Sequence, residues 1–133
     1  MTPFSDVYHA FLSKITDRDL VNNEFKDEIM EDFLRSAIAR FHHCEKDLSD
    51  TDFVLKQFNT ELDMLEIEIL ARYMVIEWTD GYIQSEEFMK QKLGNRDYTN
   101  HSPANHLEKL MDLKAYNTGE ASALIQEYYY RKM

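Results

Sequence analysis

The chain has 133 residues, of which 44% are hydrophobic and 13% aromatic, so it can bury the core of one domain and is too apolar to stay disordered. Its formal net charge of −10, without a cluster of Lys and Arg, argues against tight binding to nucleic acid. A single cysteine, Cys44, excludes an intramolecular disulfide bond, and the N-terminus lacks the pattern of a signal peptide. These features predict a soluble, intracellular protein.

The N-terminal segment predicts two helices. Thr2 followed by Pro3 is typical of a helix start, and apolar residues at helical spacing then predict a first helix near 3–16. A polar turn at 22–23 follows. The amphipathic pattern after it predicts a second helix near 25–44 with one buried face.

Residues 46–59 form a segment of a different kind. Polar turn formers occupy 47–52, and an apolar run follows at 53–58. This pattern predicts either a loop that carries one short strand or an extended arm.

The segment 60–78 predicts the most informative helix. Thr60 and Asp63 resemble a capping box at its start. Its apolar side chains form two opposite stripes, one of Leu62, Leu65, Ile69, Tyr73 and Ile76, the other of Met64, Ile67, Ala71, Met74, Val75 and Trp78. A helix that is apolar on two faces is either central in its domain or wedged between the domain and a neighbour. Interspersed charges argue against a membrane span.

The C-terminal half is more interrupted. Residues 80–81 predict the end of the preceding helix, and a short helix over 86–93 followed by a polar loop is expected next. Pro103 after Ser opens a further helical region. Gly119 leaves open whether that region forms one helix or two.

These elements together predict an all-α fold. We expect a single domain over residues 1–133, a compact bundle of about four to six helices with one extended loop or short-strand arm. The segment from about 118 to 133 is the candidate for an interface tail.

No motif predicts catalysis, since the sequence lacks nucleophile-elbow, phosphate-loop, dinucleotide and zinc-protease patterns. His42, His43 and Cys44 carry metal-ligand chemistry, but adjacent residues on a helix point in different directions. A partly buried cysteine near a helix end is the preferred interpretation. We therefore expect no enzyme, no metal site and no cofactor.

Paired carboxylates also receive a structural interpretation. Asp63 and Glu66 share one side of the 60–78 helix, as a general acid and base would have to do. Solvated polar seams explain these acids, and Glu68 with Arg72 forms an ordinary i, i+4 ion pair.

The C-terminal residues Tyr128, Tyr129, Tyr130 and Arg131 are the most suggestive surface feature. Three consecutive tyrosines on a helix cannot all face one core, and Tyr and Arg are enriched at interface hot spots. An exposed, frayed tail is the alternative. Residues 45–80 supply a second candidate surface, because this segment contains ten acidic residues and only three basic ones.

Four stretches carry a family resemblance: FSDVYHAFLSKITDRDL, EDFLRSAIARFHH, ELDMLEIEILARYMVIEW and SPANHLEKLMDL. In helix order and spacing, the chain resembles the small head–tail connector proteins of long-tailed bacteriophages, also called adaptor or head-completion proteins. The resemblance implies a structural protein of the virion neck, present in the host cytoplasm during assembly. It also implies a homo-oligomeric ring, twelvefold in that family, between the portal protein and a stopper or tail-completion protein. DNA would pass through without sequence-specific binding, and no membrane is involved.

The resemblance also assigns roles to residues. Tyr128, Tyr129, Tyr130 and Arg131 would face the portal, and an arm containing Asp47, Asp50, Asp52, Phe53, Leu55 and Phe58 would face the next ring. The sequence departs from the family in its tyrosine-rich end and in having no clear two-strand hairpin. The alternative function is a small acidic helical binding or regulatory protein that engages a basic partner through 45–80.

Overall fold

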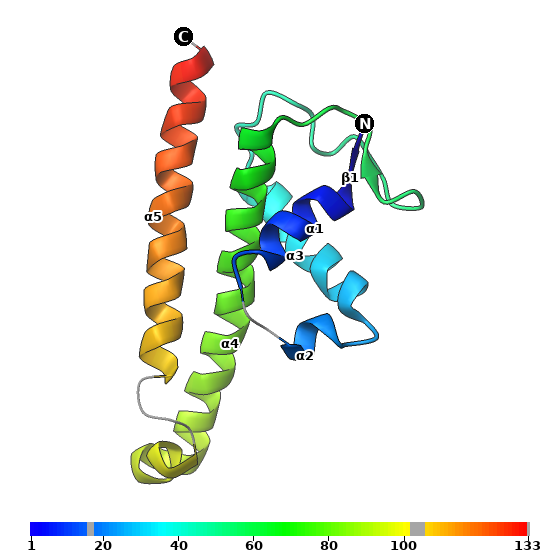
Figure 1. Ribbon diagram of the computed structural model, residues 1–133. Helices are drawn as coiled ribbons and strands as arrows, with labels where there is room; N and C mark the ends of the chain where they lie inside the picture. Colours follow the sequence, from blue (N-terminus) through cyan, green and yellow to red (C-terminus); the bar gives the residue numbers. More distant parts are fainter. Residues whose placement is uncertain (16–17, 102–105, 133) are drawn as a thin grey trace.

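A computed structural model of the chain describes residues 1–15, 18–101 and 106–132. The fold is mostly helical, with a small three-stranded antiparallel sheet. The helices are α1 (Phe4–Leu12), α2 (Arg18–Val21), α3 (Lys26–Arg40), α4 (Met64–His101) and α5 (His106–Lys132), and the strands are β1 (Thr2–Pro3), β2 (Thr51–Asp52) and β3 (Gln57–Phe58). The long helices α4 and α5 run antiparallel side by side, while α1 and α3 pack on the opposite side of α4 (Figure 1).

Helix α4 is central in the domain, which decides between the two positions that its double apolar stripe allows. It contacts α1, α3 and α5. Residues from both predicted stripes have little or no exposed surface, namely Leu62, Ile69, Ala71, Met74, Val75 and Ile76, while Leu65 and Tyr73 are half-buried. Leu62 itself precedes the first residue of the helix.

Ile69 provides a direct test of this central position. Its side chain has no exposed surface, so Ile69→Val removes one methylene from a closed core. We expect the free energy of unfolding to fall by about 0.5–1.5 kcal/mol. The measurement is urea denaturation, with Met64→Leu on the exposed start of the same helix as the control. An equal response from the two variants would contradict the packing of α4.

The N-terminal elements differ from the predicted boundaries. Thr2 is not a helix cap: it lies in β1, and its hydroxyl accepts a hydrogen bond of 2.8 Å from the backbone N–H of Leu62. Helix α1 begins at Phe4 and ends at Leu12. Helix α3 ends at Arg40, earlier than predicted, because Phe41 leaves the helical conformation and is buried in the core.

The predicted helix end at residues 80–81 is wrong, as are the separate short helix and the polar loop after it. One helix, α4, continues through Gly81 to His101. A glycine inside a helix costs about 1 kcal/mol, and packing against α5 can offset that cost. Ile83, which follows Gly81 on α4, and Leu110 on α5 are both buried. The predicted cap at Ser102 and Pro103 lies outside the described residues.

Helix α5 is one helix rather than two. The side chain of Asn117, two residues before Gly119, is hydrogen-bonded to both long helices. The Asn117 side-chain amide donates to the carbonyl of Leu113 at 2.9 Å, and its oxygen accepts a 2.9 Å hydrogen bond from Arg72 of α4. A polar residue that looks like a helix breaker is therefore a contact between the two long helices.

The segment 46–59 forms a two-strand hairpin, which corrects the prediction that no clear hairpin exists. Strand β3 pairs with β2 on one side and with β1 on the other, giving the order β1-β3-β2. The turn forms because the Asp52 carboxylate accepts hydrogen bonds from the backbone N–H groups of Val54 and Leu55 at 2.9 and 3.0 Å. Lys56 closes it with a left-handed φ of 57°.

Candidate functional site

The most unusual polar arrangement surrounds Glu66, at the start of α4. Its side chain is 0% exposed, whereas the sequence placed it in a solvated seam, so that interpretation is wrong. One oxygen accepts hydrogen bonds from the Tyr128 hydroxyl at 2.8 Å and from the Cys44 thiol at 3.4 Å. The other accepts from Lys46 at 2.9 Å. We call Cys44, Lys46, Asp63, Glu66, Tyr128 and Arg131 the Glu66 cluster.

Local sequence explains how Glu66 is positioned. Asp63 precedes α4 and its carboxylate accepts a hydrogen bond of 2.9 Å from the Glu66 backbone N–H, while Glu66 accepts one of 3.0 Å from the backbone N–H of Asp63. This is a reciprocal capping box. The box predicted at Thr60 and Asp63 is therefore displaced by three residues, and the Asp-x-x-Glu spacing was the signal that could have located it.

The C-terminal end of α5 completes the cluster. The Tyr128 hydroxyl accepts a 2.7 Å hydrogen bond from the backbone N–H of Glu45, and its ring lies 5.3 Å from that of Phe41. Arg131 pairs with Asp63 at 2.6 Å and lies 3.9 Å from Glu66. Three separate segments are joined here: the loop after α3, the start of α4 and the end of α5.

The electrostatics of the cluster keep Glu66 charged and the Cys44 thiol protonated. Burial by itself would raise the pKa of Glu66, but hydrogen bonds from Asp63, Lys46 and Tyr128 hold that pKa below its usual value. Glu66 is therefore a charged acceptor with hydrogen bonds to both of its carboxylate oxygens. Burial raises the pKa of the Cys44 thiol, so Cys44 stays protonated.

The four predicted interface residues at the C-terminus divide into two kinds. Tyr128 is fully buried, which corrects its assignment to a surface facing a partner. Arg131 is occupied by Asp63. Tyr129 is partly exposed with its ring 5.7 Å from that of His43, and Tyr130 is 71% exposed. Of the three tyrosines, Tyr130 offers the largest free surface.

The predicted arm residues also divide. Phe58 is buried, and Phe53 is half-buried with its ring 5.3 Å from Phe4 and the Arg35 guanidinium 3.8 Å from its centroid. Asp47, Asp50 and Asp52 accept hydrogen bonds within the loop, from Ser49, from Asn59, and from Val54 and Leu55. Val54 and Leu55, which we call the hairpin tip, are 89% and 66% exposed.

Cys44 is half-buried shortly after α3 ends, as expected. His42 and His43 lie in the turn after α3 rather than on the predicted helix, with their ring centroids 4.1 Å apart. Within the described ranges, no three or more His, Cys, Asp and Glu side chains are placed to hold a metal ion. No helix in the same ranges combines the length and hydropathy needed to cross a membrane. No family model, curated protein or solved structure matches this chain.

Proposed function

We propose that this chain is a structural subunit of the neck of a long-tailed bacteriophage, a ring adaptor between the portal and a stopper or tail-completion protein. The observation that carries the proposal is a pair of exposed apolar surfaces on opposite flanks of one helical domain. The C-terminal end of α5 lies on one flank and the hairpin on the other (Figure 1). A subunit that links two partners needs two such surfaces. The ring is homo-oligomeric and twelvefold, as in the family that the sequence resembles.

The hairpin tip is suited to binding because it is held in one conformation. Hydrogen bonds from Val54 and Leu55 to Asp52 fix its backbone, and the packing of Phe53 on Phe4 anchors its base. An apolar surface that is already ordered loses little conformational entropy when a partner covers it. In this proposal the hairpin tip contacts the next ring.

The second surface is the exposed face at the end of α5. The Glu66 cluster fixes this end against α4, so Tyr130 is presented from a rigid helix rather than from a frayed tail. Tyrosine buries a large area on binding at low entropic cost. In this proposal Tyr130, with the exposed part of Tyr129, faces the portal.

The acidic segment supports this function over a protein that captures a basic partner. Most acids of 45–80 already form an ion pair with a cation of the same chain. Glu61 pairs with the N-terminal amine, Asp63 with Arg131, and Glu66 with Lys46. Glu68 pairs with both Lys14 and Arg72, and Arg40 pairs with both Glu77 and Asp80. A negative surface that is largely neutralised by its own bases offers little to an external one.

Sedimentation with portal-bearing heads tests the proposal. The intact chain is expected to co-sediment with DNA-filled, tailless heads assembled from the genome that encodes it. Tyr130→Ala should weaken this binding about tenfold or more, because an exposed aromatic anchor carries much of an interface's energy. The double change Val54→Ser and Leu55→Ser should retain head binding but no longer recruit the stopper.

Circular dichroism and thermal melting of each variant serve as the control for folding. Both sites are exposed, so neither change is expected to alter melting. Failure of the folded, intact chain to join the heads would overturn the proposal. Full binding by Tyr130→Ala would remove that residue from the portal interface.

A further inference from the structure

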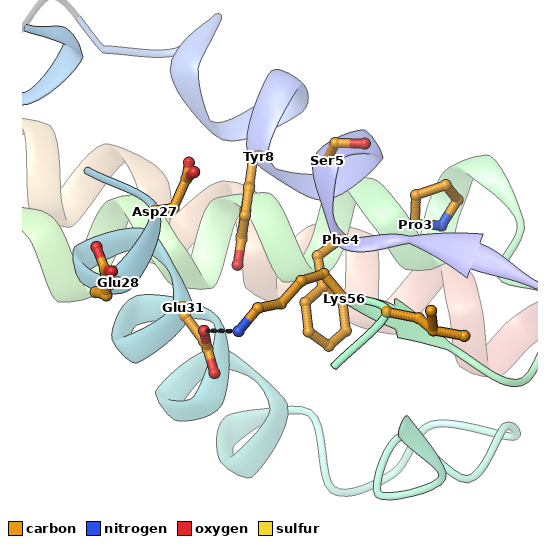
Figure 2. Close-up of a pocket in the computed structure, with 9 residues that line it drawn as sticks. Pro3, Phe4, Ser5, Tyr8, Asp27, Glu28, Glu31 and Lys56 are labelled. Carbon is orange, nitrogen blue, oxygen red and sulfur yellow. Dashed lines mark hydrogen bonds and ion pairs between the residues drawn. The ribbon is translucent and has the colours of Figure 1, made fainter. Parts of the chain in front are cut away.

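A pocket of about 450 Å³ lies between the start of α1, the start of α3 and the hairpin (Figure 2). We call it the Tyr8 pocket. It is lined by Tyr8 and Phe4 from α1, by Asp27, Glu28 and Glu31 from α3, and by Leu55 and Lys56 from the hairpin. A volume of this size accommodates a long side chain. Of this lining, the neck proposal uses only Leu55, as part of the hairpin tip.

The Tyr8 side chain is mostly buried, but its hydroxyl is open to the pocket. Its side chain is 9% exposed, and its hydroxyl points into the pocket toward Glu31 and Lys56 (Figure 2). Within the described part of the chain, no hydrogen bond to this hydroxyl is formed, and the Lys56 amine donates instead to Glu31 at 2.7 Å. The hydroxyl is therefore accessible from the pocket and available to accept a hydrogen bond from a ligand.

The rim of the pocket carries excess negative charge. Glu31 is already paired, because both Lys56 and Arg35 bind it. No described cation lies within ion-pair distance of Asp27 or Glu28. Burial, and then the charges of Glu31 and Asp27, raise the pKa of the Tyr8 hydroxyl well above its usual value. The hydroxyl therefore stays protonated, and the field at its oxygen favours an approaching cation.

We propose that the Tyr8 pocket binds an arginine side chain presented by a basic segment of a partner protein. The Tyr8 oxygen would accept one guanidinium N–H, and Asp27 and Glu28 would accept others from the rim. A guanidinium has five donors in one plane, which suits acceptors that converge from two helices, whereas an ammonium is a point charge. Leu55 would cover the aliphatic stem of the arginine.

The occupant follows from charge and shape together. A bare divalent cation does not fit, since the described carboxylates are not placed as a metal-binding group. A neutral apolar side chain would leave the Tyr8 hydroxyl and two carboxylates without partners. A cation with a long apolar stem satisfies the rim, the hydroxyl and the hairpin at once. This inference stands whether or not the chain is a neck protein.

The test uses the capped peptide acetyl-Gly-Leu-Arg-Gly-amide and the same peptide with citrulline, an uncharged isostere, in place of arginine. Titrations of the full chain are followed by two-dimensional amide NMR. The arginine peptide is expected to give saturable shifts at residues of the Tyr8 pocket. The citrulline peptide should bind about tenfold more weakly or worse, since it lacks the charge that strengthens these hydrogen bonds.

Three variants assign the binding to the pocket. Tyr8→Phe removes only the hydroxyl, and Asp27→Asn removes only a rim charge, so each should raise the dissociation constant of the arginine peptide severalfold or more with little change in melting temperature. Asp6→Asn, an exposed acid of α1 that does not line the pocket, is the matched control and should bind normally. Equal binding of both peptides, or binding unaffected by both pocket variants, would overturn the proposal.

Discussion

Tyr128→Ala is expected to lower the free energy of unfolding by about 3–5 kcal/mol, a large part of the ~5–15 kcal/mol that holds a typical domain together. The ring of Tyr128 is fully buried and packs edge-on against Phe41 at 5.3 Å. Its hydroxyl also connects Glu66 to the backbone of Glu45. The alanine variant thus loses core packing and leaves a buried carboxylate with one donor fewer.

A series of three variants separates these contributions in urea denaturation. Tyr128→Phe keeps the ring and should cost about 1–3 kcal/mol, the usual penalty for leaving a buried polar group without its partner. Tyr130→Ala, two residues further along the same helix but 71% exposed, should stay within about 0.5 kcal/mol. Equal stabilities for Tyr128→Ala and Tyr130→Ala would mean that the end of α5 does not dock on the core.

This result also bears on truncation before Tyr128. From the sequence alone, such a truncation is expected to leave the monomer folded, because a terminal turn usually contributes little to a core. The burial of Tyr128 contradicts that expectation. An interface test at this end of the chain must therefore use Tyr130 and leave Tyr128 in place.

Features encoded by local periodicity could be read from the sequence. The apolar spacing identified α1 and α3, and the two stripes of 60–78 identified a helix that is covered on both sides. The ion pair between Glu68 and Arg72, at 3.2 Å, follows from i, i+4 spacing in the same way. Each of these depends only on residues that lie within a few turns of one another.

Features that depend on distant partners could not be read. Gly81 appears to end a helix only if α5 is ignored, and packing between the two long helices carries α4 past it. The three-stranded sheet requires β3 to pair with a strand at the N-terminus, which no pattern within residues 51–58 indicates. Glu66 looks solvated on a helical wheel because its partner, Tyr128, is 62 residues away.

The candidate surfaces show the same division. The hairpin tip and Tyr130 were found within segments that the sequence singled out, since exposed apolar and aromatic residues at turns and chain ends are local signals. The Tyr8 pocket was missed. It forms from α1, the start of α3 and the hairpin, and only the folded chain brings Tyr8, Asp27 and Lys56 together.

Glu66→Gln is expected to destabilise the protein by about 3 kcal/mol at pH 7. Removing one partner from a buried ion pair costs about 3–5 kcal/mol, and the lower end applies because Lys46 and Arg131 are partly exposed and can regain water. The glutamine amide would also turn a donor toward the donors of Lys46, Tyr128 or Asp63. Glu127→Gln, an exposed change next to Tyr128, is the matched control and should stay within about 0.5 kcal/mol.

The effect of Glu66→Gln should depend on pH with a definite sign. The pKa of Glu66 in the folded protein lies below its ordinary value of 4.5, so the unfolded chain takes up a proton at a higher pH than the folded one. Stability from the charged carboxylate is therefore complete above about pH 5 and is lost as the pH falls through the folded pKa.

The glutamine variant has no such proton to bind. Urea denaturation from pH 7 to pH 3 should show the gap between the two proteins narrowing as the solution becomes acidic, while the Glu127→Gln control follows the wild type. A gap that stays constant over this range would show that the loss comes from packing and not from the charge of Glu66.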